Sequence, residues 1–170
     1  MMLLRNCLVY VAVFLAVEGM NPRVSWAGDK GRLRWMTFDD GTVQAKQSGK
    51  KILIDVYTDW CVWCKRMDQN TYSDDSVAAY LQRHYVLVRL NAESKAQLSY
   101  KGQRFSEMEL ARAFGVNGYP TTIFLKANGD PITSMPGYAD AGRFGDVLRF
   151  IGEDIYLTKK FDEFLKSRQD

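Results

Sequence analysis

A Cys-x-x-Cys pair that follows a run of apolar residues is the feature of this sequence that most limits its fold. Residues 52–57 (ILIDVY) have the β-branched and aliphatic composition of a buried strand, and Cys61 and Cys64 follow within a few residues. A helix that begins at Cys61 presents unpaired N–H groups and a dipole that favour negative charge, so this thiol can ionise near neutral pH. Cys64 then lies one turn later, within disulfide reach. The spacing is typical of a redox-active thiol pair.

The other uses of such a pair fit less well. A disulfide with this short spacing closes too small a loop to stabilise a fold, so an inert structural disulfide is the weaker interpretation. A zinc site needs further ligands, but His84 is the only histidine and there is no second cysteine pair. Covalent haem attachment needs a histidine where this chain has Lys65. We expect no metal and no cofactor apart from the redox-active disulfide Cys61–Cys64.

The composition is that of a single soluble domain. The 170 residues are 46% hydrophobic and 25% charged, which is enough to bury one core. There are 23 Lys and Arg residues against 20 Asp and Glu residues, a net charge of +3, and they form no basic block. We therefore expect no nucleic-acid partner, and we expect a monomer.

The first 27 residues have the layout of a signal peptide. Arg5 supplies the positive start, residues 7–17 form an apolar run too short to span a bilayer, and Ser25 and Ala27 are small residues of the kind a signal peptidase reads. The expected mature domain is 28–170, which retains only two cysteines. An uncleaved N-terminus that anchors the protein to a membrane remains the alternative, because the segment before the cleavage site is long.

Apolar periodicity and turn residues outline an α/β domain. Strand, helix and strand follow one another at the spacing of a βαβ unit, which predicts a parallel strand pair. The expected elements are, in order: a short strand or extended segment at 33–38, a helix at 39–49, a strand at 51–57, a helix opened by the cysteine pair, its continuation at 76–85 after a break at 72–75, a strand at 86–91, and an irregular surface insertion at 92–104 with a turn at 101–102.

The second half of the chain has clear local signals. Ser106 and Glu109 have the spacing of a capping box, which predicts a helix that continues to Phe114. A turn at residues 127–130 joins two strands, and Pro131 places the second of them at a sheet edge. The remaining expected elements are these two strands at 121–125 and 131–135 and helices at 141–151 and 155–167.

These motifs together resemble the thioredoxin superfamily. Residues 52–65 are similar to its central strand, active-site loop and helix start, residues 118–122 (GYPTT) to its cis-proline loop, and residues 127–130 to its last hairpin. The resemblance covers residues 38–151. It implies a thioredoxin fold, an α/β domain whose central mixed sheet is flanked by helices, with residues 152–170 as an extra C-terminal helical extension.

The resemblance also implies roles around the thiols. Cys61 is the exposed nucleophile, whose thiolate attacks a partner's disulfide, and the more buried Cys64 resolves the mixed disulfide. Asp55 matches the family's buried acid, whose pKa burial would raise towards the range of a base; a surface acid is the alternative interpretation. Arg89 matches a lysine that neighbours that acid and, being always charged, can hold it ionised.

A second set of residues is expected to bind the partner protein. Trp60 and Trp63 flank the thiols and are interpreted as a docking rim, with packing in the core as the alternative for each. Pro120 is expected in cis, as the resemblance implies, so that the Tyr119 backbone faces a partner strand; a trans turn proline is the alternative. Lys65 is the one cation directly beside the thiol pair.

The expected function is that of an exported, periplasmic thiol-disulfide oxidoreductase that reduces protein disulfides. Val62 and Trp63 between the cysteines are uncharged and lack the cationic stabilisation of strong oxidants, which favours a reductase. The chain is similar to the C-terminal domain of the membrane electron carrier DsbD and to SoxW-type thioredoxins, which implies a membrane thiol-electron donor. A disulfide isomerase or oxidase and a non-catalytic thioredoxin-fold binding module remain the alternatives.

Overall fold

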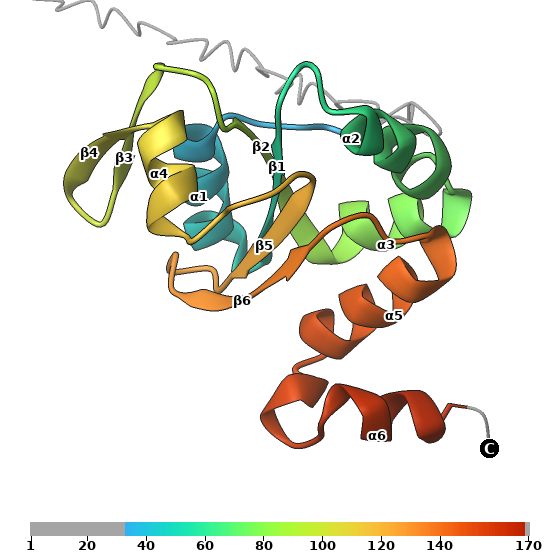
Figure 1. Cartoon of the computed structure of the whole chain (residues 1–170). Coiled ribbons are helices and arrows are strands. Elements are labelled where there is room, and N and C mark those ends of the chain that lie inside the picture. The colour runs from blue at the N-terminus through green and yellow to red at the C-terminus, as the bar shows by residue number, and fades with distance from the viewer. Residues whose placement is uncertain (1–32, 169–170) are drawn as a thin grey trace, which may run out of the picture.

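The computed structural model describes residues 33–168 (Figure 1). The expected signal peptide at residues 1–27 lies outside the described residues. Within residues 33–168, every helix is too short or too polar to cross a membrane. Residues 33–37, before α1, are extended and form one isolated parallel bridge, between Met36 and Val88. They are therefore the extended segment of the two predicted alternatives, not a strand.

A mixed sheet with the strand order β2-β1-β5-β6 forms the centre of the domain. β1 (Lys51–Tyr57) runs parallel to β2 (Tyr85–Asn91) and antiparallel to β5 (Thr121–Leu125). β6 (Pro131–Pro136) pairs with β5 at the edge, as Pro131 predicts. The predicted βαβ unit and the mixed sheet are confirmed.

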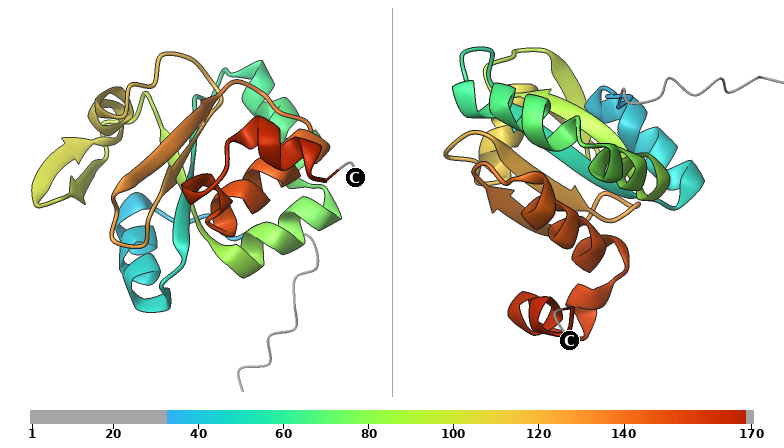
Figure 2. Two further views of the ribbon diagram at one scale, coloured as in Figure 1. Left: turned by 90° about the horizontal axis from the view of Figure 1, so that it is seen from below. Right: turned by 90° about the vertical axis from the view of Figure 1, so that its right-hand side faces the viewer.

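Helices cover both faces of this sheet (Figures 1 and 2). α1 and α4 pack on one face, whereas α2, α3 and α5 pack on the other. Figure 2 shows α6 on the outer side of α5, away from the sheet. The bounds are α1 Phe38–Ser48, α2 Val62–Met67, a π-helical turn η1 Asp68–Tyr72, α3 Asp75–His84, α4 Glu107–Ala113, α5 Ala141–Gly152, a 3₁₀ turn η2 Ile155–Leu157 and α6 Phe161–Lys166.

The alternation of side chains along β1 decides which residue lies beneath the active-site helix. Ile52, Ile54 and Val56 belong to the core on the α1 and α4 side. Leu53 belongs to the opposite core, together with residues of α2, α3 and α5. Because strand side chains alternate, Asp55 shares the face of Leu53 and is directed towards the helices that follow the cysteines.

Local capping determines where the helices begin and end. Thr37 caps the start of α1, since its Oγ1 accepts the Asp40 N–H at 3.2 Å, and Gly49 caps its end with a left-handed φ of 71°. The Ser106 hydroxyl accepts the Glu109 N–H at 3.2 Å, and the Ser106 N–H donates to Glu109 Oε2 at 2.7 Å. The predicted capping box of α4 is therefore confirmed.

Residues 92–104 do not form the irregular insertion that the sequence predicts. They contain most of a hairpin of β3 (Gln97–Tyr100) and β4 (Gln103–Ser106), which lies beside α1 and α4 in Figure 1. The predicted turn is present, with φ of 50° at Lys101 and 80° at Gly102. The hairpin could not be recognised from the sequence because most of its side chains are polar and exposed. Leu98 is its one buried hydrophobic side chain, in the core on the α1 side.

The expected C-terminal helix is present but shorter than residues 155–167. Asp154 adopts a left-handed φ of 59°, so the chain makes the 3₁₀ turn η2 and then begins a new helix, α6. The Lys51 ammonium holds this bend, because Nζ lies 2.9 Å from Asp154 Oδ2 and donates to the Gly152 carbonyl at 3.2 Å. The rings of Phe150 and Phe164 are 5.6 Å apart and join α6 to α5.

Gly41 allows α1 to approach the sheet, and we expect its replacement to destabilise the fold. A Cβ at Gly41 would overlap the Val88 side chain of β2. We expect Gly41→Ala to lower the free energy of unfolding by about 1–3 kcal/mol, the usual cost of overpacking. Gly145→Ala in α5 is the matched control, since nothing lies within 4 Å of its Cβ and the better helix propensity should stabilise. Urea unfolding measures both, and equal stability of the two variants would contradict the packing argument.

Candidate redox-active site

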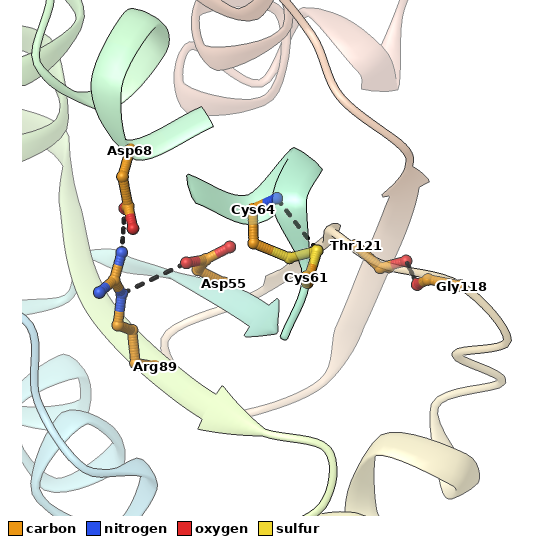
Figure 3. Close-up of a disulfide and its surroundings, with 7 residues drawn as sticks. All are labelled: Asp55, Cys61, Cys64, Asp68, Arg89, Gly118 and Thr121. Atoms are coloured by element: carbon orange, nitrogen blue, oxygen red, sulfur yellow. Dashed lines mark hydrogen bonds and ion pairs between the residues drawn. A yellow bond between two sulfur atoms is a disulfide. The ribbon is translucent and has the colours of Figure 1, made fainter. Parts of the chain in front are cut away.

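Cys61 and Cys64 form a disulfide at the start of α2 (Figure 3). Cys61 is the N-cap residue of α2, and its Sγ accepts the Cys64 N–H at 3.0 Å. The Cys61 N–H in turn donates to the Thr58 carbonyl at 3.2 Å, which closes the turn between β1 and α2. The first cysteine sulfur therefore lies where the unpaired N–H groups of the helix start are concentrated.

Solvent exposure does not distinguish the two cysteines. The sequence leads us to expect an exposed Cys61 and a more buried Cys64, but Cys61 is 4% exposed and Cys64 is 7% exposed. This difference from the expectation arises because the exposed surface of the loop comes from the neighbouring Trp60, Val62 and Trp63 side chains, each at least half exposed. Only the N-cap position of Cys61 separates the two thiols.

An acid lies beneath the disulfide on β1. Asp55 is 3% exposed, and Figure 3 draws its carboxylate between Arg89 and Cys64. Arg89 Nε lies 3.3 Å from Asp55 Oδ2, and the same guanidinium forms an ion pair with Asp68. The guanidinium carbon lies 4.7 Å from the ring centroid of Trp35 and 5.5 Å from that of Tyr57. Arg89 is thus held in place and shared between a buried and a half-exposed carboxylate.

Burial raises the pKa of Asp55 from its usual 3.8 to about 6. The positive charge of Arg89 lowers this pKa, and the negative charge of Asp68 raises it again. Desolvation therefore outweighs the ion pair. An acid with this pKa is ionised at neutral pH and can still accept a proton, which is what a general base needs.

Two aromatic pairs flank the thiols, and we call them the aromatic rim. Trp60 is 63% exposed, its ring lies 6.0 Å edge-on from Tyr119, and its indole N–H donates to Glu93 at 2.9 Å. Trp63 is 50% exposed and its ring lies 5.6 Å from Tyr138. The indoles are therefore exposed but oriented by neighbours.

The loop before β5 completes the site. The Tyr119–Pro120 peptide bond is cis. The Pro120 carbonyl accepts the Gly137 N–H at 2.8 Å, and the Thr121 hydroxyl donates to the Gly118 carbonyl at 2.8 Å, so the loop is anchored on both sides. Among the described residues, the Tyr119 N–H and C=O have no backbone hydrogen-bond partner.

The site also contains residues that the sequence analysis did not single out, among them Asp68, Tyr72 and Tyr138. Asp68 follows Cys64 by one helical turn, and this spacing could have indicated it. Tyr72 and Tyr138 have no such signal, because the π-helical turn and the segment after β6 bring them to the site. Lys65, by contrast, is exposed and forms no ion pair within the part of the chain that the structure describes.

The chemistry of the site is therefore that of a dithiol with a buried acid. Over residues 33–168, no three His, Cys, Asp or Glu side chains gather in a way that could hold a metal ion. The fold and the Cys61–Cys64 disulfide define the class of thioredoxin-like domains with a thiol pair that can undergo disulfide exchange.

The chain belongs to the family described as the thioredoxin-like domain, whose model matches residues 38–152. It is 33% identical over 104 residues to the thiol:disulfide interchange protein DsbD of Yersinia pestis (strain Pestoides F), which covers 60% of this chain and 16% of the relative. It is also 34% identical over 102 residues to the thiol:disulfide interchange protein DsbD of Vibrio vulnificus (strain CMCP6). That match covers 59% of this chain and 16% of the relative. The expected relation to DsbD is confirmed, and the chain spans about a sixth of the length of these relatives.

Solved structures show the same architecture. A thioredoxin-fold protein from Helicobacter pylori matches with a TM-score of 0.58 and 25% identity over 71% of this chain and 80% of that one. A putative disulphide-isomerase from Bacteroides thetaiotaomicron matches with a TM-score of 0.56 and 27% identity, over 70% of this chain and 90% of that one. The predicted α/β thioredoxin fold is confirmed.

Proposed function

We propose that this protein is a thiol-disulfide oxidoreductase that reduces disulfides of partner proteins through Cys61 and Cys64. The observation that carries this proposal is the Cys61–Cys64 disulfide at the N-cap of α2, beside the buried Asp55 (Figure 3), in a domain of the thioredoxin-like family. A structural disulfide would not require an ionisable acid buried beneath it, because burying a carboxylate costs stability.

The first step uses the dithiol form of the protein. The Cys61 thiolate, stabilised by the helix start, attacks one sulfur of the partner's disulfide. A bond forms between Cys61 Sγ and that sulfur while the partner's sulfur-sulfur bond breaks, and the partner's released thiolate takes up a proton from water. The product is a mixed disulfide between the two proteins.

The second step releases the partner. The Cys64 thiol gives its proton to the Asp55 carboxylate and attacks Cys61 Sγ, which breaks the mixed disulfide. The partner's second sulfur leaves as a thiolate and takes up a proton from water, while Asp55 later returns the proton of Cys64 to water. Two electrons have then passed from the dithiol to the partner's disulfide. The positive charge of Arg89 favours the ionised form of Asp55, and the negative charge of Asp68 offsets part of this effect.

Partner binding uses the surface around the thiols. The aromatic rim offers two exposed indoles held by their neighbours, which suits contact with a partner's backbone and apolar side chains. The unpaired Tyr119 N–H and C=O offer short strand-like pairing to an extended segment that carries the partner's cysteine. Lys65, beyond the thiols, adds positive potential to this surface.

Insulin reduction tests the proposed function. The purified protein should accelerate reduction of insulin disulfides by dithiothreitol, measured as the onset of turbidity. A rate equal to that of dithiothreitol alone would favour a thioredoxin-fold binding module without catalysis. A disulfide isomerase is the second candidate, supported by the structural likeness to a putative disulphide-isomerase, and refolding of a scrambled disulfide protein distinguishes it.

We expect a reduction potential on the reducing side of the thiol-disulfide scale. Val62 and Trp63 add no positive charge between the thiols, and Lys65 is exposed beyond them, so the Cys61 thiolate depends mainly on the helix start. The expected potential is below about −200 mV. Equilibration with glutathione or dithiothreitol buffers, followed by tryptophan fluorescence, measures it. A potential near about −120 mV would identify an oxidant instead.

We also propose export, with residues 28–170 as the mature domain and a membrane-bound thiol carrier as the electron donor. The layout of residues 1–27 and the relation to DsbD support this proposal. A reductant in an oxidising compartment needs such a donor to restore its dithiol. N-terminal sequencing of the exported protein tests the start at Gly28, and an intact Met1 would contradict it.

A further inference from the structure

A buried tyrosine hydroxyl lies close to the acid beneath the disulfide. Tyr72 ends the π-helical turn η1 and is 4% exposed. Its ring packs edge-on against Trp35 at 5.1 Å and against Phe144 at 5.5 Å, so its position is defined by two aromatic neighbours. Its hydroxyl is fully buried and closes no hydrogen bond within the described residues. A buried hydroxyl without a partner lowers stability, so its presence here needs an explanation.

Two other buried oxygens in the same place also lack a partner. They are Asp55 Oδ1 and Thr122 Oγ1. Asp55 and Thr122 are directly opposite each other in the β1–β5 register, on the sheet face where Leu53 and Tyr72 share one core. The Trp35 ring contacts both the Tyr72 ring, at 5.1 Å, and the Arg89 guanidinium that pairs with Asp55, at 4.7 Å. Arg89 approaches the other carboxylate oxygen, Oδ2, at 3.3 Å. Oδ1 is thus the oxygen of Asp55 that is left for a second donor.

We propose that Tyr72 is a positioning residue for the buried acid, its hydroxyl donating to Asp55 Oδ1 whenever the carboxyl group is ionised. Asp55 then has Arg89 on one oxygen and Tyr72 on the other. When Asp55 takes up a proton, the Tyr72 hydroxyl turns to Thr122 Oγ1, which is the alternative acceptor. The change needs only rotation of a hydroxyl hydrogen, so the acid can gain and lose its proton without movement of the core.

Tyr72 acts among several other charged or ionisable groups, and the test must keep them constant. Arg89 lowers the pKa of Asp55 and Asp68 raises it. The proposed hydrogen bond from the Tyr72 hydroxyl also lowers the pKa of Asp55, because it stabilises the carboxylate. The remaining groups that face Asp55 are the Tyr57 phenol and the Cys61–Cys64 disulfide. Tyr72→Phe removes the hydroxyl and leaves all of these in place.

Titration of Asp55 in the oxidised protein tests the proposal directly, because the cysteines do not titrate in that form. The ¹³C resonance of the Asp55 carboxyl carbon reports its protonation. We expect the Tyr72→Phe variant to titrate about one pH unit higher than the wild type, as the loss of one hydrogen bond to a charged group requires. The matched control is Tyr85→Phe, which loses a buried hydroxyl that donates to the Leu148 carbonyl at 2.7 Å, away from Asp55. It should lose stability without a change of the Asp55 midpoint.

The pH dependence of mixed-disulfide resolution is a second test, because a Tyr72 that only stabilised the fold would not change it. This part rests on the proposed function, in which Asp55 takes the proton of Cys64. Starting from a midpoint near 6, a shift by about one pH unit should slow resolution of a mixed disulfide about fivefold at pH 6 and less than twofold at pH 8. A wild-type protein that does not reduce insulin would refute the proposed function but would leave the titration result intact.

An unchanged Asp55 midpoint in Tyr72→Phe, or an equal shift in Tyr85→Phe, would overturn the proposal. The wild type provides a measurement that needs no variant. The ¹³Cζ resonance of Tyr72 should titrate with the midpoint of Asp55, because its hydroxyl changes acceptor as the acid is protonated. A Tyr72 resonance that stays constant through that pH range would overturn the proposal even if the Tyr72→Phe variant failed to fold.

Discussion

Cys61→Ser abolishes disulfide reduction, whereas Cys64→Ser still attacks partners and accumulates mixed disulfides with them. The reason is the position of Cys61 at the N-cap of α2, where the helix start stabilises a thiolate. Cys64 lies inside the helix and is needed only to break the bond between the two proteins. We expect insulin reduction by both variants to fall by at least a hundredfold, and only Cys64→Ser to yield disulfide-linked complexes on non-reducing gels.

The control for this experiment is the double variant, Cys61→Ser with Cys64→Ser, which should capture nothing. Cys61 and Cys64 are both buried in the disulfide form, so solvent exposure does not predict which of them is the nucleophile. The prediction depends on the position of Cys61 at the helix start. Equal capture of partners by the two single variants would show that either thiol can act as the nucleophile. The assignment of roles would then be wrong.

Asp55→Asn stabilises the folded protein at pH 7 while it slows thiol exchange. The pKa of Asp55 is about 6 in the folded protein, above its usual 3.8. Between these two values the folded state binds more protons than the unfolded state, so stability falls as the pH rises through this window. The ionised carboxylate therefore costs stability at pH 7, and asparagine removes the charge. We expect the free energy of unfolding to increase by about 3 kcal/mol at pH 7.

The difference should disappear well below pH 3.8, where Asp55 carries a proton in both states. Urea unfolding at about pH 3 and at pH 7 measures it. Arg89 keeps Asp68 as a partner in the variant, so no buried cation is left alone. Asp68→Asn is the matched control, since that carboxylate is 42% exposed and its removal should change stability less. Lower stability of Asp55→Asn at pH 7 would show that the ion pair outweighs burial.

The same variant should resolve mixed disulfides more slowly, by at least tenfold at pH 7, because asparagine cannot accept the Cys64 proton. Stopped-flow mixing with a chromogenic disulfide separates this step from the initial attack by Cys61. A slower attack with unchanged resolution would place Asp55 in a different role.

Several elements of the fold could be predicted because their determinants are close together in the chain. The spacing of Ser106 and Glu109 specifies the start of α4, because capping involves residues three apart. The continuous apolar run of β1 identifies a strand covered on both faces. The alternation of β1 then places Asp55 on the face of the cysteine-bearing helix, so the buried acid follows from local pattern and family resemblance together.

The β3–β4 hairpin was not predictable in the same way. Its strands are short and mostly exposed, and they depend on contacts with distant parts of the chain. The Ser99 N–H donates to Asp39 of α1 at 2.9 Å, and the Tyr100 hydroxyl donates to the Gly129 carbonyl at 3.0 Å. Such contacts bring together segments separated by tens of residues, and no local periodicity reports them.

The sequence by itself determined the positions of the two cysteines at a helix start and of an acid on the strand beneath them, because these depend on spacings of a few residues. Only the tertiary structure decided the environment of that acid. Arg89 comes from β2, Tyr72 from a π-helical turn and Thr122 from β5, and the packing of three separate elements brings their side chains to Asp55. The pKa of a buried group depends on its neighbours in space, so the chemistry of this site becomes visible only in the folded chain.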